Sequence, residues 1–269
     1  MKVVLFCGGL GMRIRDYSDT LPKPMVPIGD RPILWHVMKY YAHHGHKDFI
    51  LCLGYKGTLI KEFFLRYDEC VSNDFVYSNG GKNLELIGSD IQDWKITFVD
   101  TGLYANLGER LLAVRQHLQD EPMFLANYTD GLSDVSLPDM IDRFATQDAV
   151  GTFVGVRPNA TFHWVERDDQ DYVTDFRHVT QTPRRVNGGF FVFRQAIFDY
   201  VREGEELVEE PFRRLIAARR LTTYCYDGFW ACMDTVKELT QLEQLYARGN
   251  APWELWKRRQ AEAKVPTLS

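Results

Sequence analysis

Residues 5–28 read LFCGGLGMRIRDYSDTLPKPMVPI, in which an apolar strand runs into a glycine cluster and widely spaced cations follow. A P-loop is excluded, because Gly11 is followed by Met12 and Arg13 and the Gly-Lys-Ser/Thr ending of that motif is missing. A dinucleotide-binding turn is disfavoured, since prolines from Pro22 onward keep the next segment out of a helix. The stretch therefore predicts a loop whose glycine N–H groups approach a base and a triphosphate.

Two cations of this stretch, Arg13 and Lys23, would reach the same anion from two points of one excursion of the chain. Such a pair suits a displacement at phosphorus, where negative charge builds up on the phosphate oxygens. Taken singly, either residue, like Arg15, is as well explained as a solvated surface charge. Their spacing after a glycine-rich strand exit favours a catalytic site.

The composition limits the classes of partner. The chain has 269 residues, 45% of them hydrophobic and 26% charged, which is ordinary for an enzyme. A net charge of −5 gives no broad basic face, so we expect no nucleic-acid partner. The five cysteines form no CxxC pair, and no apolar run reaches the roughly 18 to 20 residues that span a bilayer. We expect a soluble, cytoplasmic protein with no membrane partner.

Short β-branched or aromatic runs alternate with helical patterns along most of the chain. The predicted strands are KVVLF (2–6), DFILCL (48–53), KITFVD (95–100), MFLA (123–126), GTFVGV (151–156), GFFVF (189–193) and TTYCY (222–226). Helices are expected between residues 32 and 45 and near 107–117, 137–145, 195–201, 211–219 and 236–247. Strands this apolar are typical of a mostly parallel sheet with helices on both faces, so the pattern predicts the α/β class.

Two segments depart from this alternation. Residues 68–94 are long and polar, with one possible hairpin around Gly80 and Gly81, and segments of this kind are usually functional or interfacial. The tail from residue 251 carries Trp253 and Trp256 at a spacing that can pack a helix onto the body. We predict one domain over 1–250 and a helical appendage over 251–269.

Two carboxylates are candidate ligands of Mg²⁺. Asp130 follows an apolar strand, at the end where open α/β sheets bind ligands. Asp234 comes from a distant segment just before a predicted helix, so a role as the N-terminal cap of that helix stays open. Carboxylates from separate segments can jointly hold Mg²⁺, which bridges to phosphates and keeps several waters.

GGLGMR followed by PKPMVPIGDRPILWHVM resembles the signature of the sugar-phosphate nucleotidyltransferases, G-G-x-G-T-R-L and then K-P-M. The match covers nearly the whole chain, through GYKG (54–57), VDTG (99–102), GERL (108–111), DG (130–131), NGGFFV (187–192), GFWACMDT (228–235) and APWELW (251–256). The resemblance implies a Rossmann-like, mostly parallel mixed sheet flanked by helices on both faces. It also implies a nucleotide-binding half over about 1–135 and an acceptor-binding half over about 136–250.

The resemblance also implies roles for individual residues. Arg13 and Lys23 would be catalytic, and Asp130 with Asp234 would bind the metal. The residues implied in nucleotide binding are Phe6, Gly8, Gly9, Leu10, Gly11, Met12, Arg110 and Thr129. Those implied near the acceptor are Asn187, Gly188 and Gly189, with Arg177 and His178 at the positions of a family Glu–Lys pair. Asn187 and the glycines would equally suit a tight turn between strands.

Arg110 bears on the choice of nucleotide. It lies in the first turn of a predicted helix, where the helix dipole disfavours a cation, so another reason must place it there. In the family's cytidylyltransferases, the arginine of a matching GGRL stretch contacts cytosine, which offers a carbonyl and a ring-nitrogen acceptor. We therefore expect CTP, while a solvated arginine, and dTTP or UTP as the donor, stay open.

The chain departs from the family pattern at three places. Met12 replaces the usual threonine of the glycine loop, which removes one hydroxyl near the nucleotide. His163 stands at a usual glycine, and Arg177 and His178 replace the Glu–Lys pair, unless this segment is a solvated loop. The acceptor side is therefore less determined than the nucleotide side.

The resemblance implies transfer of CMP from CTP to a sugar 1-phosphate, with glucose 1-phosphate as the expected acceptor and pyrophosphate as the leaving group. Another sugar phosphate, or a small phosphate or phosphonate, stays open as the acceptor. A regulatory subunit that binds nucleotide sugars without catalysis is disfavoured, because a pure binder has no need of the whole set Arg13, Lys23, Asp130 and Asp234. We also expect a homo-oligomer.

Overall fold

The computed structural model describes residues 1–8, 20–67, 74–87, 90–158 and 162–257. Its central sheet has the strand order β13-β10-β14-β8-β1-β4-β7, with β15 beside β10. The strands are β1 (Val3–Phe6), β4 (Asp48–Leu53), β7 (Lys95–Asp100), β8 (Met123–Tyr128), β10 (Gly151–Val156), β13 (Val186–Asn187), β14 (Phe191–Arg194) and β15 (Leu221–Tyr226). The pairs of β1 with β4 and β8, of β4 with β7 and of β10 with β15 are parallel, whereas β14 is antiparallel to both neighbours. The predicted mostly parallel mixed sheet is confirmed.

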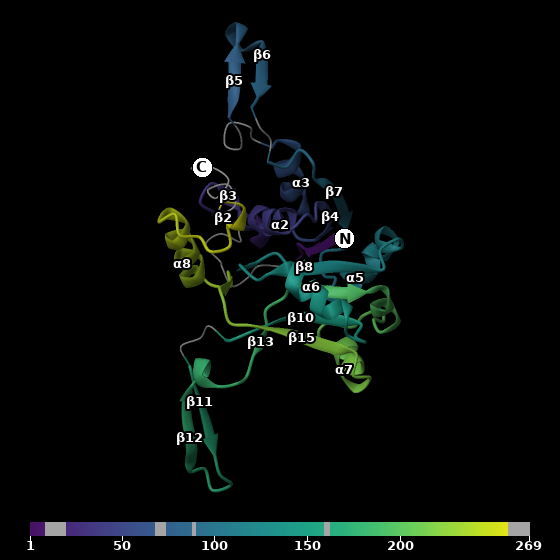
Figure 1. Ribbon diagram of the computed structural model, residues 1–269, viewed down its shortest axis with the longest axis vertical. Helices are drawn as coiled ribbons and strands as arrows, with labels where there is room; N and C mark the ends of the chain where they lie inside the picture. The colour runs from purple at the N-terminus through teal and green to yellow at the C-terminus, as the bar shows by residue number, and fades with distance from the viewer. Residues whose placement is uncertain (9–19, 68–73, 88–89, 159–161, 258–269) are drawn as a thin grey trace, which may run out of the picture.

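Helices cover both faces of this sheet (Figure 1). They are α2 (Ile33–His43), α3 (Gly57–Leu65), α5 (Leu107–Val114), α6 (Leu137–Ala145), α7 (Glu210–Ala217) and α8 (Val236–Ala247). Alternate residues of β1 face opposite ways: Val3 and Leu5 join the core under α2, α6 and α8, and Val4 and Phe6 join the core under α5 and α7. Because both faces are buried, β1 is continuously apolar, as the sequence pattern indicates.

One predicted helix is wrong in type. In place of the helix predicted near 195–201, a short 3₁₀ helix, η5 (Gln195–Asp199), follows β14 directly. No side chain caps its start, and the Tyr200 N–H donates to the Ile197 carbonyl three residues back, which tightens the turn. A similar 3₁₀ turn, η3 (Arg115–Leu118), continues α5, so the segment predicted near 107–117 is helical in two pieces.

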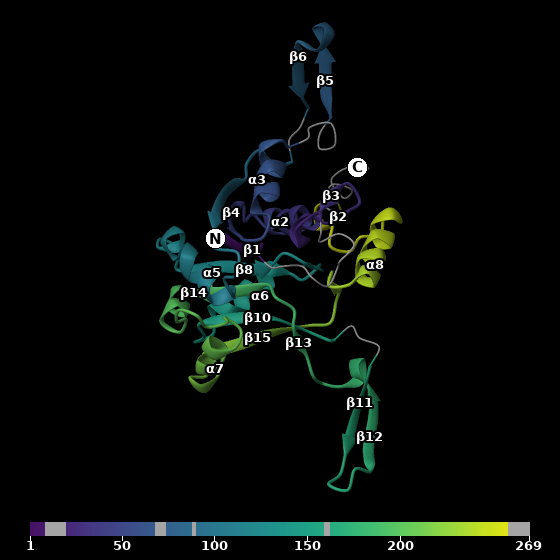
Figure 2. The ribbon, with the colours of Figure 1, turned by 180° about the vertical axis from the view of Figure 1, so that it is seen from behind.

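Two antiparallel hairpins project from opposite ends of the molecule, as both views show (Figures 1 and 2). The first, β5 (Phe75–Ser78) with β6 (Asn83–Leu86), confirms the predicted hairpin, and Gly80 and Gly81 lie at its tip with positive φ. The second, β11 (His163–Arg167) with β12 (Val173–His178), was not predicted. Neither hairpin pairs with the central sheet.

Smaller strand pairs lie around the ends of the sheet. They are β2 (Pro27–Ile28) with β3 (Arg31–Pro32), and β9 (Gly131–Ser133) with β16 (Trp230–Cys232). The second pair joins two distant segments, because β9 follows Asp130 and β16 precedes Asp234. In the described part of the chain, no helix is both long and apolar enough to cross a membrane.

The described part of the tail, residues 251–257, packs onto the body through its tryptophans. The predicted helical appendage over 251–269 falls mostly on residues 258–269, which lie outside the described residues. Trp253 is fully buried, and its Nε1–H donates to Nδ1 of His36 on α2 at 3.2 Å. Trp256 lies edge-on to Trp35, with ring centroids 5.8 Å apart. Strands from 1–135 and from 136–250 share one sheet, and the domain boundary at residue 250 stays a prediction.

Replacing Trp253 by Ala is expected to lower the free energy of unfolding by about 3–5 kcal/mol, because it empties a fully enclosed site. Urea unfolding followed by circular dichroism measures the change. Leu65→Ala is the matched control, since that side chain is 81% exposed. A loss below about 1 kcal/mol for Trp253→Ala would contradict the packing described here.

Candidate active site

Lys23 joins two carboxylates from distant segments. Its ammonium donates to Asp130 Oδ2 and to Asp234 Oδ1, each at 2.6 Å. Burial opposes the charge on Lys23, but the two carboxylates outweigh this effect and hold its pKa above its usual value. The lysine is therefore a cation held between two anions, on the 3₁₀ turn η1 (Lys23–Met25).

The fold supplies each carboxylate from a different side. Asp130 follows β8 at the carboxyl end of the parallel strands, where ligands bind in open α/β sheets. Asp234 precedes α8, but it does not cap that helix, because Thr235 and Glu238 form the capping box. The Asp234 N–H donates to Glu238 Oε2 at 2.8 Å, which fixes its backbone and leaves its carboxylate for Lys23. The alternative reading of Asp234 as a helix cap is therefore wrong.

The two carboxylates suit a small divalent cation. They already hold one cationic group between them, and they are 28% and 36% exposed, so solvent reaches both. Among the described residues, no group of three or more His, Cys, Asp or Glu side chains could hold a metal. A pair of carboxylates supplemented by water and phosphate oxygens is a donor set that Mg²⁺ accepts.

Arg110 is buried, which excludes the reading as a solvated arginine. It is 2% exposed, and its Nη1 donates to the Leu53 carbonyl at 3.1 Å and to Thr101 Oγ1 at 2.6 Å. Burial lowers the pKa of the guanidinium from its ordinary value. A Cβ on Gly8 would lie 2.0 Å from the guanidinium carbon, so only glycine allows this close approach. The structure thus brings Arg110 to the root of the glycine loop.

The other residues implied in nucleotide binding divide into two groups. Phe6 ends β1, and its carbonyl accepts a hydrogen bond from Thr129 Oγ1 at 3.2 Å, so both lie at the same sheet edge as Gly8. The remaining ones, Gly9, Leu10, Gly11, Met12 and the catalytic candidate Arg13, lie outside the described residues.

Asn187 ends β13, and Gly188 and Gly189 lie where the chain passes to β14, which continues along β10 in the same direction. The Asn187 side chain accepts from the Gly189 N–H at 2.9 Å and donates to the Tyr128 hydroxyl at 3.2 Å. The Gly188 carbonyl accepts from Trp230 Nε1 at 2.9 Å. Tyr128 and Trp230 were not singled out from the sequence, although Trp230 lies in the quoted motif GFWACMDT. The predicted tight turn between strands is wrong, because β13 and β14 both run antiparallel to β10 and follow one another along it, so the chain does not reverse between them. The role of these residues toward an acceptor stays a prediction.

Arg177 and His178 lie on β12, in the hairpin that projects from the body (Figure 1). Arg177 is exposed and pairs with Asp175, and His178 Nδ1 lies 2.7 Å from Thr180 Oγ1. His163 is the register partner of His178 across the hairpin and stacks on Phe176. The segment is thus a regular hairpin and not a loop, and within one chain these residues contact each other instead of the Lys23 centre.

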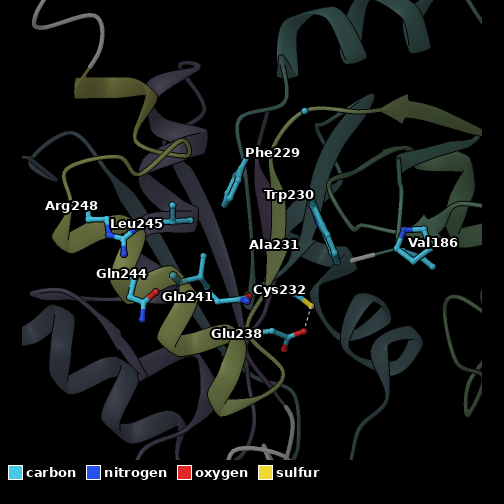
Figure 3. Close-up of a pocket in the computed structure, with 13 residues that line it drawn as sticks. Val186, Phe229, Trp230, Ala231, Cys232, Glu238, Gln241, Gln244, Leu245 and Arg248 are labelled. Atoms are coloured by element: carbon cyan, nitrogen blue, oxygen red, sulfur yellow. Dashed lines mark hydrogen bonds between the residues drawn. The ribbon is translucent and has the colours of Figure 1, made fainter. Parts of the chain in front are cut away.

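A pocket of about 590 Å³ lies between β16 and α8 (Figure 3). Trp230 and Cys232 of β16 line one part of it, and Glu238, Gln241 and Gln244 of α8, with Arg248 just after the helix, line another. Cys232 Sγ lies 3.8 Å from Asp234 Oδ2 and 3.9 Å from Glu238 Oε1. Burial and these carboxylates raise the pKa of the thiol to about 12, so it stays neutral. The pocket therefore adjoins the Lys23 centre through Glu238 and Cys232.

Comparison with known proteins identifies the family. A profile described as nucleotidyl transferase matches residues 2–248. The chain belongs to the nucleotidyl transferase family. It is 36% identical over 258 residues to a Bacillus subtilis protein named probable glucose-1-phosphate cytidylyltransferase, covering 95% of this chain and 100% of that relative. It is also 36% identical over 262 residues to glucose-1-phosphate cytidylyltransferase of Salmonella typhimurium, again covering 95% of this chain and 100% of the relative.

The fold agrees with this membership. A putative glucose-1-phosphate thymidylyltransferase from Bacillus anthracis superposes with a TM-score of 0.63 at 14% identity, covering 91% of this chain and 94% of that one. The family match and the two relatives at 36% identity confirm the resemblance to sugar-phosphate nucleotidyltransferases. As a nucleotidyl transferase, the chain is an enzyme of group transfer, and its central sheet is the family's nucleotide-sugar transferase sheet.

Proposed function

We propose that this chain transfers CMP from CTP to glucose 1-phosphate, giving CDP-glucose and pyrophosphate. The observation that carries the proposal is the meeting of Lys23, Asp130 and Asp234 at the sheet edge that also holds Arg110 and Gly8. Relatives named glucose-1-phosphate cytidylyltransferase match over their whole length, which supports the choice of nucleotide and acceptor.

In the proposed reaction, an oxygen of the acceptor phosphate attacks the α-phosphorus of CTP, and the bond to the β-phosphate oxygen breaks. No side chain has to remove a proton, because the phosphate oxygen is already ionised at neutral pH. Lys23 would orient the attacking phosphate and the α-phosphate and neutralise their charge. Arg13, outside the described residues, would stabilise the departing pyrophosphate. Asp130 and Asp234 would hold Mg²⁺, which supplies further charge neutralisation on the triphosphate when bound.

The proposal is tested by pyrophosphate release with CTP, UTP, dTTP, GTP and ATP against a panel of acceptors. We expect the highest kcat/KM for CTP with glucose 1-phosphate. The replacement of the usual Glu–Lys pair by Arg177 and His178 makes other sugar phosphates and small phosphonates the informative members of the panel. Tight binding of nucleotide sugars without pyrophosphate release from any pair would instead support a regulatory binding protein.

Arg110→Lys is expected to lower the preference for CTP over UTP by about tenfold, since lysine keeps the charge but loses the planar fork of donors. The ratio of kcat/KM values for the two nucleotides measures this effect. Arg115→Lys, on the exposed turn after α5, is the matched control. An unchanged ratio in a folded Arg110→Lys protein would remove Arg110 from base recognition.

The two projecting hairpins support a homo-oligomer. Most exposed large hydrophobic side chains of the described residues lie on or beside them: Val76, Tyr77, Leu84, Leu86, Ile87, Phe162, Trp164, Val165, Tyr172, Val173 and Phe176. Two-stranded hairpins are marginal in water without a partner surface. A second copy of the chain would supply such a surface. Arg177 and His178 of one copy would then lie near the other copy.

Light scattering of the protein as it elutes from a size-exclusion column measures the oligomeric state directly. One chain has a mass of 31.3 kDa, and we expect a mass of at least twice this value. Replacing Trp164 and Phe176 together by Ser is expected to lower that mass, whereas Leu65→Ser, at an exposed position on α3, leaves it unchanged. A monomer of the unaltered protein at micromolar concentration would contradict the proposal.

A further inference from the structure

Asn127 is a buried polar side chain in an otherwise apolar strand. It lies on β8 and is 1% exposed, and its Oδ1 accepts from the Phe190 N–H at 2.8 Å. A buried amide is costly unless it is hydrogen-bonded, so its presence in the core calls for a use. Its partner is the backbone of Phe190, in the irregular segment Gly188–Phe190 between β13 and β14.

The Gly188–Phe190 segment has an unusual backbone. Gly189 has φ +77° and Phe190 has φ +53°, so two successive residues adopt the left-handed conformation. A residue with a Cβ is uncommon there, and surrounding contacts have to hold it. Phe190 is held twice: its ring, 2% exposed, packs edge-on against Tyr40 of α2, and its N–H is held by Asn127.

Asn127 also fits closely against the glycine. A Cβ on Gly189 would lie 2.4 Å from Asn127 Oδ1, so the amide occupies the space that any other side chain would need. The conformation of this segment fixes the directions of two polar groups. The Gly188 carbonyl reaches Trp230, and Asn187 reaches the Tyr128 hydroxyl, which lies two residues before Asp130.

We propose that Asn127 is a positioning residue for acceptor binding: it fixes the Gly188–Phe190 segment and thereby holds Asn187 where the sugar hydroxyls of the acceptor bind. The inference rests on the proposed function and on the acceptor role that the family resemblance implies for Asn187. Asn127 itself touches neither substrate. Asn127 lies on β8, and the same strand leads to Asp130. This strand therefore aligns the Gly188–Phe190 segment with the reacting centre.

Initial rates with CTP and glucose 1-phosphate varied separately test this proposal. In Asn127→Leu, which has no acceptor for the Phe190 N–H, we expect the KM for glucose 1-phosphate to rise about tenfold. A rise of this size corresponds to the loss of about one hydrogen bond to the sugar. The KM for CTP stays within about twofold, because the nucleotide side is untouched. Asn127→Asp, which keeps an oxygen at the same place, is expected to restore most of the acceptor affinity.

The controls separate positioning from general stability. Thr152→Val replaces another buried polar residue of the same sheet, and both KM values should stay unchanged. If Asn127→Leu fails to fold, Asn127→Ser, whose shorter side chain cannot reach the Phe190 N–H, takes its place with the same expected shift.

Equal rises of both KM values, or an unchanged acceptor KM in a folded variant beside an active unaltered protein, would overturn the role of Asn127 alone. Absence of turnover in the unaltered protein would overturn the proposed function and this inference with it.

Discussion

Asp130→Asn is expected to lower kcat by about 10³-fold while the protein stays folded. A metal ion supplies several kcal/mol of transition-state stabilisation, and each 1.36 kcal/mol corresponds to a factor of ten in rate. The amide keeps the shape of the carboxylate but loses the charge that would hold Mg²⁺ with Asp234. The Asp130 side chain is 28% exposed, and Lys23 keeps Asp234 as a partner, so the change leaves no buried unpaired charge.

Pyrophosphate release over a range of Mg²⁺ concentrations measures this loss, and thermal unfolding checks the fold. Asp139→Asn on the exposed side of α6 is the control and should be fully active. Activity of Asp130→Asn within about fivefold of the unaltered protein would remove Asp130 from the metal site.

Lys23→Met is expected to lower kcat by about 10²-fold or more, since it keeps the length of the side chain and removes the charge that would neutralise the phosphates. In the structure this ammonium holds both carboxylates, and its long stem lets it turn to phosphate oxygens that bind beside them. Added Mg²⁺ is not expected to restore the rate, because a metal held by Asp130 and Asp234 would not replace Lys23 in orienting the attacking phosphate.

Steady-state kinetics with both substrates saturating measures this effect. Lys47→Met, at a surface ion pair with Asp93, is the matched control and should leave kcat unchanged. A normal kcat for Lys23→Met would mean that its contact with the two carboxylates is structural.

The sequence predicts the central sheet well because its strands are buried on both faces. Runs such as 48–53 and 95–100 match β4 and β7 residue for residue. The hairpin of β11 and β12 could not be predicted in this way, because most of its side chains are exposed and no apolar pattern marks its strands. The pattern of β8 does not reveal the polar roles of Asn127 and Tyr128 at its end, because their hydrogen-bond partners, Phe190 and Asn187, lie far away in the sequence.

The candidate site was predictable in its types of residue but not in its contacts. Lys23, Asp130 and Asp234 were all singled out from their motifs, yet only the tertiary structure brings the three together. Arg110 was noted as a cation in an unfavourable place, and the structure gives the reason: its partners, Leu53 and Thr101, come from the ends of other segments. Contacts between distant segments leave no local trace in the sequence.

We propose that the centre formed by Lys23, Asp130 and Asp234 transfers CMP to a sugar phosphate. Incubating the purified protein with Mg²⁺, CTP and glucose 1-phosphate and quantifying the products by mass spectrometry tests this directly. We expect CDP-glucose and pyrophosphate in equal amounts, with both lost in Asp130→Asn and retained in Asp139→Asn. Absence of CDP-glucose with the folded, unaltered protein, or its undiminished formation by Asp130→Asn, would show that this centre does not carry out the transfer.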